Sequence, residues 1–149
     1  MKNLFLIIGL LISFGKGIKA QQICNTTNGV ALSGYDPVSY FTAGKAVEGS
    51  KNISYNQAGV TYYFASETNR NLFKKSPTSF EPQYGGWCAY AMGKTGEKVE
   101  VDPETFKIIN GKLYLFYNAY FNNTLPKWNK DEVSLKALAD KNWNNLLKK

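Results

Sequence analysis

The chain has 149 residues, with 18 Lys and Arg against 11 Asp and Glu, a formal net charge of +7, and no histidine. The missing histidine excludes every Ser-His-Asp or Cys-His nucleophile and every His-ligated metal site, and two cysteines are too few for a four-cysteine zinc site in one monomer. The basic residues are spread along the chain rather than gathered in a stripe, so we expect a solvated basic surface and no nucleic-acid partner.

The first 20 residues predict a secretory signal peptide. Lys2 supplies a short basic start, residues 4–14 form an apolar run of 11, and a more polar stretch ends at Ala20. The run is too short to span a bilayer, so we expect an exported protein, periplasmic or secreted, with no membrane insertion after cleavage. Removing residues 1–20 takes away three lysines and no acids, which lowers the net charge from +7 to +4.

Residues 21–30 are predicted to be a flexible polar lead, followed by one domain over residues 31–149. Asp36-Pro37 marks a helix start and Gly44 its end. Apolar side chains alternate on both sides of Ala58-Gly59, which predicts a β-hairpin over residues 52–66.

Helices are predicted after this hairpin. Ser66 is the expected N-cap of a helix over residues 67–75 with Leu72 and Phe73 facing inward, and Ser76-Pro77 predicts a short helical turn. We place a further helix over residues 87–92.

The last third predicts a second hairpin, with a tight turn at Asn110-Gly111, and then a helix over residues 131–147. The broad apolar stripe expected on this helix comprises Val133, Leu135, Leu138, Ala139, Trp143, Leu146 and Leu147. The predicted fold class is α+β: a single small domain of two β-hairpins packed with several short helices and a longer C-terminal helix.

Three sequence blocks carry a family resemblance: "GYDPVSYF", "GVTYYFASETNRNLFKKSPTSF" and "PQYGGWCAYAM". In this order they resemble the YHS domain family, and more narrowly its exported, stand-alone bacterial members, over about residues 31–143. The resemblance implies a non-enzymatic binding module and, from the members associated with copper-transporting ATPases, heavy-metal handling through three cysteine thiolates. Ser39, Ala65 and Asn69 occupy those three positions here. That metal site therefore does not carry over, because none of these residues replaces a thiolate for a soft metal.

The metal ligands that remain are sulfurs. Cys88 and Met92 stand at i and i+4 on the predicted helix, and Cys24 is a conceivable third ligand, which together suit Cu(I). Plain core packing is the competing interpretation, because buried Cys and Met are common core fillers. Since an oxidising compartment allows two cysteines to pair, a Cys24–Cys88 disulfide is a further prediction.

The aromatic residues around Cys88 predict a different site. Tyr84, Trp87 and Tyr90 would wall an apolar pocket for a small molecule, with Cys88 as a ligand contact or as a redox thiol. On this hypothesis the protein binds a small molecule or exchanges thiols; a third possibility is a structural or interaction domain that has lost metal binding. No catalytic residue is predicted, because no paired acid and base stand out.

Overall fold

Two-residue turns join most of the strands, and in each turn both residues have a left-handed backbone conformation, with positive φ. The computed structural model describes residues 23–149, so the predicted signal peptide lies outside the described residues. Ala58 (φ 51°) and Gly59 (φ 88°) join one strand pair, and Asn110 (φ 50°) and Gly111 (φ 72°) join another. Turns of this type match the right-handed twist of the strands they join, and both predicted hairpins are confirmed. The strands concerned are β3 (Ser50–Gln57), β4 (Val60–Phe64), β5 (Asp102–Ile109) and β6 (Lys112–Phe116).

The first half of the described chain is built on a mixed sheet whose strand order is β1-β2-β4-β3. The two added strands are β1 (Thr26–Thr27) and β2 (Val30–Ala31), and β2 pairs in parallel with β4 at Val30 and Thr61. The helices of this half are η1 (Leu32–Gly34), α2 (Ser39–Thr42), α3 (Glu67–Lys75) and η2 (Pro77–Ser79). Alternate residues of β4 point into the core and pack on Phe73 of α3, which is fully buried.

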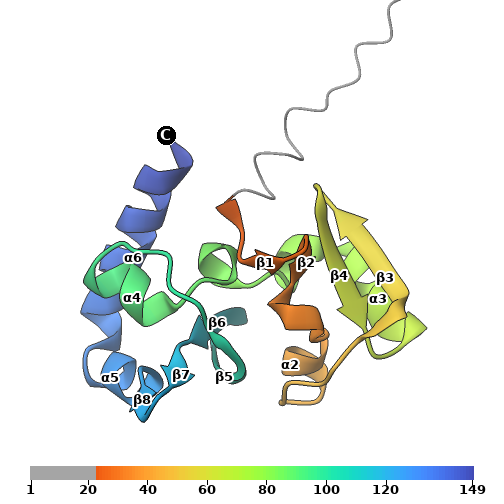
Figure 1. Ribbon diagram of the computed structural model, residues 1–149, viewed down its shortest axis with the longest axis horizontal. Helices are drawn as coiled ribbons and strands as arrows, with labels where there is room; N and C mark the ends of the chain where they lie inside the picture. Colours follow the sequence, from red (N-terminus) through yellow and green to blue (C-terminus); the bar gives the residue numbers. More distant parts are fainter. Residues whose placement is uncertain (1–22) are drawn as a thin grey trace, which may run out of the picture.

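The second half is mainly helical. Its helices are η3 (Gln83–Gly86), α4 (Ala89–Lys94), α5 (Leu125–Lys130) and α6 (Glu132–Leu147). A small separate hairpin is formed by β7 (Asn118–Ala119) and β8 (Asn122–Asn123). In Figure 1 the helices α4, α5 and α6 gather on the left, the β3–β4 hairpin and α3 lie on the right, and β5–β6 lies between them.

β6 is the wall shared by two hydrophobic cores. Leu113 and Leu115 belong to the core on the β3–β4 side, and Tyr114 and Phe116 belong to the core on the helical side. Since successive side chains of a strand point to opposite faces, both faces of this strand are buried. The α+β class and the single small domain predicted from the sequence are confirmed.

Several details differ from the expectation. α4 begins at Ala89 instead of residue 87, because Trp87 (ψ 160°) and Cys88 (ψ 116°) have non-helical backbones. Leu72 is 38 % exposed, so only Phe73 of the expected pair faces inward. The apolar stripe of α6 is also narrower than predicted. Leu135 and Ala139 are buried, Trp143 and Leu146 pack beside them, and Val133, Leu138 and Leu147 are exposed.

The lead before the domain is attached to the segment around Gly85 from Ile23 onward. Asn25 N donates to Gly85 O at 2.8 Å, and Trp87 Nε1 donates to Ile23 O at 2.7 Å. Gly85 (φ 60°) passes so close to this lead that a Cβ there would lie 3.2 Å from Cys24 Cα and 2.9 Å from the Trp143 ring. None of the helices in the described part of the chain is both long and apolar enough to span a bilayer.

Candidate functional site

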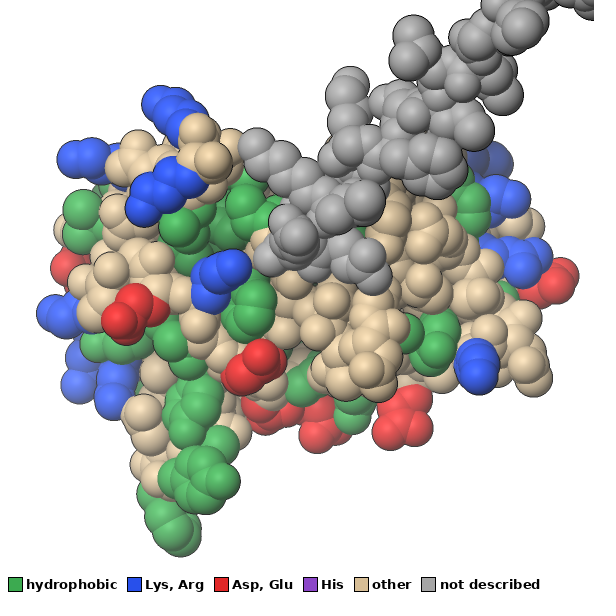
Figure 2. All heavy atoms as spheres, turned by 45° about the horizontal axis from the view of Figure 1, so that its top comes forward, with side chains coloured by type: hydrophobic (Ala, Val, Ile, Leu, Met, Phe, Trp, Pro, Cys, Tyr) green, Lys and Arg blue, Asp and Glu red, His purple; other side chains and the backbone are tan. Residues whose placement is uncertain are grey.

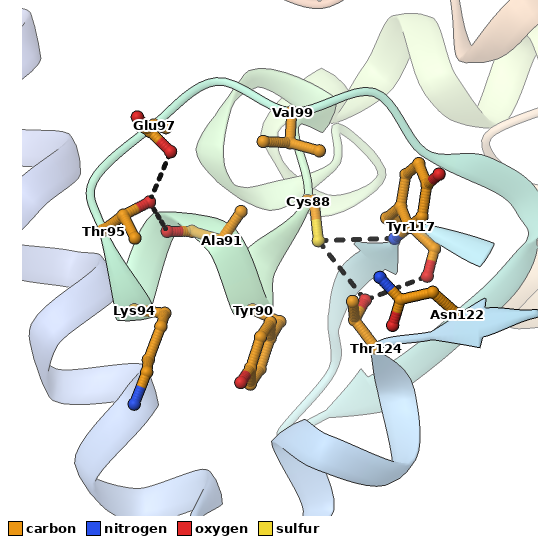
Figure 3. Close-up of a pocket in the computed structure, with 10 residues that line it drawn as sticks. All are labelled: Cys88, Tyr90, Ala91, Lys94, Thr95, Glu97, Val99, Tyr117, Asn122 and Thr124. Carbon is orange, nitrogen blue, oxygen red and sulfur yellow. Dashed lines mark hydrogen bonds between the residues drawn. The ribbon is translucent and has the colours of Figure 1, made fainter. Parts of the chain in front are cut away.

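A cavity of about 300 Å³ opens beside Cys88, between α4 and the chain that leads from β6 to α5. Its floor and walls combine a thiol, two tyrosines and small side chains with polar groups (Figure 3). Cavities of this size that mix apolar surface with a few polar groups are typical of small-molecule sites. The lining residues are Cys88, Tyr90, Ala91, Lys94, Thr95, Glu97, Val99, Tyr117, Asn122 and Thr124.

The Cys88 sulfur is held by a ring of hydrogen bonds. Tyr117 N donates to Cys88 Sγ at 3.3 Å, and Thr124 Oγ1 lies 3.5 Å from the same sulfur. The single hydrogen of the Thr124 hydroxyl is donated to Tyr117 O at 3.0 Å, so the thiol hydrogen is the one shared between Cys88 Sγ and Thr124 Oγ1. The sulfur is thereby aimed at the chain that joins β6 to β7, as Figure 3 shows.

Charged and hydroxyl groups lie at the outer edge of the cavity. Lys94 is exposed, and Glu97 is exposed and accepts a hydrogen bond from Thr95 Oγ1 at 3.0 Å. Tyr90 and Lys94 extend from α4 in the same direction, away from the Cys88 sulfur (Figure 3). This arrangement offers apolar contacts inside and both signs of charge at the rim, which suits a small amphipathic molecule.

The structure divides the predicted aromatic pocket. Tyr90 lines the cavity with Cys88, but Tyr84 and Trp87 do not. Tyr84 is buried in the helical core, where its hydroxyl donates to Asp140 Oδ1 at 2.7 Å. Trp87 is bonded to the N-terminal lead, and Lys98 Nζ lies 5.6 Å above the centroid of its ring.

The three predicted sulfur ligands also have separate surroundings. Met92 is fully buried in the helical core, Cys88 lines the cavity described above, and Cys24 lines a second cavity. Among residues 23–149, no three His, Cys, Asp or Glu side chains come together as a possible metal site. Both cysteines are free thiols, so the Cys24–Cys88 disulfide stays a prediction for the oxidised chain.

The second cavity, of about 370 Å³, contains three ionisable groups. Burial raises the pKa of the Glu81 carboxyl. Burial first, and then the charge of Glu81, raises the pKa of the Cys24 thiol. The pKa of Tyr62 is raised in the same way, by burial and then by Glu81 and Cys24. Burial and the Glu81 carboxylate thus disfavour the thiolate of Cys24, which makes it a weak nucleophile at neutral pH.

Replacing Glu81 with glutamine is expected to lower the pKa of Cys24, because it removes one of the two causes that raise it. Alkylation by iodoacetamide proceeds through the thiolate, so the pH profile of Cys24 labelling, followed by peptide mass spectrometry, should move to lower pH. Glu97→Gln is the matched control, since Glu97 lines the other cavity. An unchanged profile in Glu81→Gln would contradict this assignment.

The residues at the three positions where YHS domains carry thiolates all bond to Asp36. Asp36 is fully buried, and its Oδ2 accepts hydrogen bonds from Ala65 N at 2.8 Å and Asn69 Nδ2 at 2.7 Å. Ser39 Oγ donates to Asp36 O at 2.7 Å and is buried as well. Ser39 is therefore not the ordinary surface residue that its polarity suggests; these positions form a structural hydrogen-bond network.

The sequence did not point to Asn122 or Thr124 as cavity residues. One signal was present, because Thr124-Leu125-Pro126 has the composition of a helix start, with proline in the first turn. That signal would have predicted α5 and placed Thr124 at its beginning. The contact with Cys88, 36 positions away, has no local signal.

Comparison with known proteins found no match: no family model, no curated protein and no solved structure is similar to this chain. The resemblance to the YHS domain family rests on the three sequence blocks alone.

Proposed function

We propose that the chain is an exported, non-enzymatic binding module of the YHS type that holds a small amphipathic molecule in the cavity beside Cys88. The observation that carries the proposal is the cavity itself. Its wall is held by the bonds of the Cys88 sulfur to Tyr117 N and Thr124 Oγ1, and its rim carries the exposed side chains of Lys94 and Glu97. The faces of Tyr90 and Tyr117 supply apolar contact, and the rim supplies charge.

Binding without catalysis agrees with the placement of the ionisable groups. Lys94 and Glu97 lie at the rim, and Glu97 is engaged by Thr95. General acid–base chemistry needs a group within hydrogen-bond reach of the reacting atom, and the groups that reach Cys88 Sγ are a backbone amide and a threonine hydroxyl. The proposed role of Cys88 is therefore to hold together the wall of the cavity, through its bonds to Tyr117 and Thr124.

The soft-metal function implied by the resemblance has weaker support, because Cys88, Met92 and Cys24 lie in three different environments. The redox alternative needs a thiol that reagents reach, whereas the Cys88 side chain has no exposed surface in this structure. A structural role without a ligand is the outcome to be excluded by the experiment below.

The experiment that tests the proposal fills the cavity with a bulky side chain. Ala91, a half-buried residue of its lining, is replaced with tryptophan, and binding of 1-anilinonaphthalene-8-sulfonate is titrated by fluorescence. We expect Ala91→Trp to weaken binding about tenfold or more, since the added ring occupies the space of the ligand. Ala43→Trp, at an exposed position beyond the end of α2, is the matched control and should leave the affinity unchanged.

Amide chemical-shift mapping with the same probe checks the location. The largest changes should fall on Cys88, Tyr117 and Thr124, whose amides or side chains line the cavity. Equal affinities for Ala91→Trp and the unmodified chain, or shifts confined to other parts of the protein, would overturn the proposal.

A further inference from the structure

The tip of the β7–β8 hairpin is the most exposed apolar feature of the described chain. The turn between Ala119 and Asn122 consists of Tyr120 and Phe121, two residues that are 92 % and 112 % exposed. Figure 2 shows hydrophobic side chains projecting at the lower left, where β7 and β8 lie in Figure 1. Two adjacent, fully exposed aromatic residues indicate a surface that contacts a partner or a membrane.

The backbone of this turn is strained, which sets it apart from the other hairpins. Tyr120 has φ 50° and Phe121 has φ 60°, both in the left-handed region that disfavours bulky side chains. The other three two-residue turns use a glycine at the second of these positions: Asn28-Gly29, Ala58-Gly59 and Asn110-Gly111. The strained aromatic pair therefore has no role in the turn geometry itself, and such strain is characteristic of functional sites.

The base of the hairpin is firmly held, so the tip is presented in a fixed direction. Thr124 N donates to Tyr117 O at 3.0 Å, and Asn118 Nδ2 donates to Thr105 Oγ1 at 2.9 Å. On the other strand, Lys127 Nζ donates to Asn122 Oδ1 at 2.6 Å. These bonds surround the base of the hairpin with amide groups and one ammonium group.

We propose that Tyr120 and Phe121 insert into the interface of a lipid bilayer that carries anionic headgroups. The hairpin has an apolar tip, then the exposed amides of Asn118 and Asn122, and then the ammonium of Lys127. This order matches the order of acyl chains, glycerol and ester groups, and phosphates in a bilayer leaflet. Aromatic side chains concentrate at the interface between the acyl chains and the headgroups, and basic side chains are attracted to anionic lipids.

The shape and charge of the protein favour a lipid surface over a second protein. A tip of two residues is convex and offers little area for a stable protein interface, but a deformable leaflet closes around it. The chain is also basic, with a net charge of +7, or +4 once residues 1–20 are removed, which adds a long-range attraction to an anionic surface. The proposal is independent of the function proposed for the cavity, and contact at the interface involves no membrane-spanning segment.

The test is binding to vesicles of phosphatidylglycerol and phosphatidylcholine, measured by co-sedimentation. Tyr120→Asn combined with Phe121→Gly converts the tip into the turn chemistry of Asn110-Gly111. We expect the double variant to bind vesicles about tenfold more weakly and, because the strain is relieved, to melt about 3–4 °C higher. Ala58→Asn, in the turn of the β3–β4 hairpin, is the matched control and should leave vesicle binding unchanged.

A second measurement locates the contact independently of any contribution that residues 1–22 make to vesicle binding. Phe121→Trp places a tryptophan at the tip, and its fluorescence should be quenched by bilayers of brominated lipid more than that of the unmodified chain. The proposal is overturned if the double variant binds vesicles as tightly as the unmodified chain, or if brominated lipid does not quench the tip tryptophan. Dimerisation that depends on the tip, seen by analytical ultracentrifugation, overturns it in favour of a second copy of the chain.

Discussion

Replacing Asp36 with alanine is expected to lower the free energy of unfolding by about 3–5 kcal/mol. The carboxylate is fully buried and accepts hydrogen bonds from Val38 N, Ala65 N and Asn69 Nδ2, at 2.8, 2.8 and 2.7 Å. It thus connects the beginning of α2, the end of β4 and the first turn of α3. Alanine leaves these three donors without the acceptor that the buried carboxylate supplies, and each orphaned donor costs free energy.

Asp36→Asn is the conservative control for this prediction. An asparagine oxygen in place of Oδ2 keeps the bonds from Ala65 and Asn69, but the amide nitrogen then faces Val38 N–H. The expected loss is about 1–2 kcal/mol, one orphaned donor instead of three. Urea unfolding followed by circular dichroism measures both variants; losses below 1 kcal/mol in Asp36→Ala would contradict the role of this network.

Replacing Gly93 with alanine is expected to lower the free energy of unfolding by about 2–3 kcal/mol. A Cβ at this position would lie 2.5 Å from Leu135 O, on the backbone of α6. A glycine-to-alanine change inside a helix otherwise stabilises it by about 0.5–1 kcal/mol. The sign is therefore reversed by the close approach of α4 and α6, which must move apart to admit one methyl group.

Gly44→Ala separates this steric effect from backbone strain. Gly44 has φ 66°, and a Cβ there would meet nothing within 4 Å, so the expected loss is the cost of the left-handed conformation, about 1 kcal/mol. Thermal unfolding of both variants gives the comparison. Equal stability of Gly93→Ala and the unmodified chain would mean that α4 and α6 pack less closely than described.

Elements with strong local signals were predictable from the sequence. The hairpin turns at Ala58-Gly59 and Asn110-Gly111 were placed correctly, because each ends in a glycine, which readily adopts the left-handed backbone that such a turn requires. The N-cap at Ser66 is also confirmed, since its side chain accepts a hydrogen bond from Asn69 N at 3.1 Å. Burial was harder to predict. The apolar residues of α6 suggest a broad stripe, but the helix packs on one side only, and Val133 is 85 % exposed.

The candidate site was only half predictable. Cys88 and Tyr90 stood out because a rare thiol lies among aromatic residues, and both line the cavity. Tyr117 and Thr124 reach Cys88 through the return of the chain after β6, a tertiary contact that no local pattern encodes. Trp87 and Met92 shared the same sequence signal as Cys88 and point elsewhere, because α4 begins only at Ala89 and its preceding residues are extended.

The burial of β6 on both faces has a consequence for the cooperativity of unfolding. Opening the half that contains Asp36 uncovers Leu113 and Leu115, and opening the helical half uncovers Tyr114 and Phe116. Either event removes apolar contacts from the same five-residue strand, so neither half retains its stability alone. We therefore expect the two halves to unfold in a single transition, so that a substitution at Gly93 also lowers the stability of the half that contains Asp36.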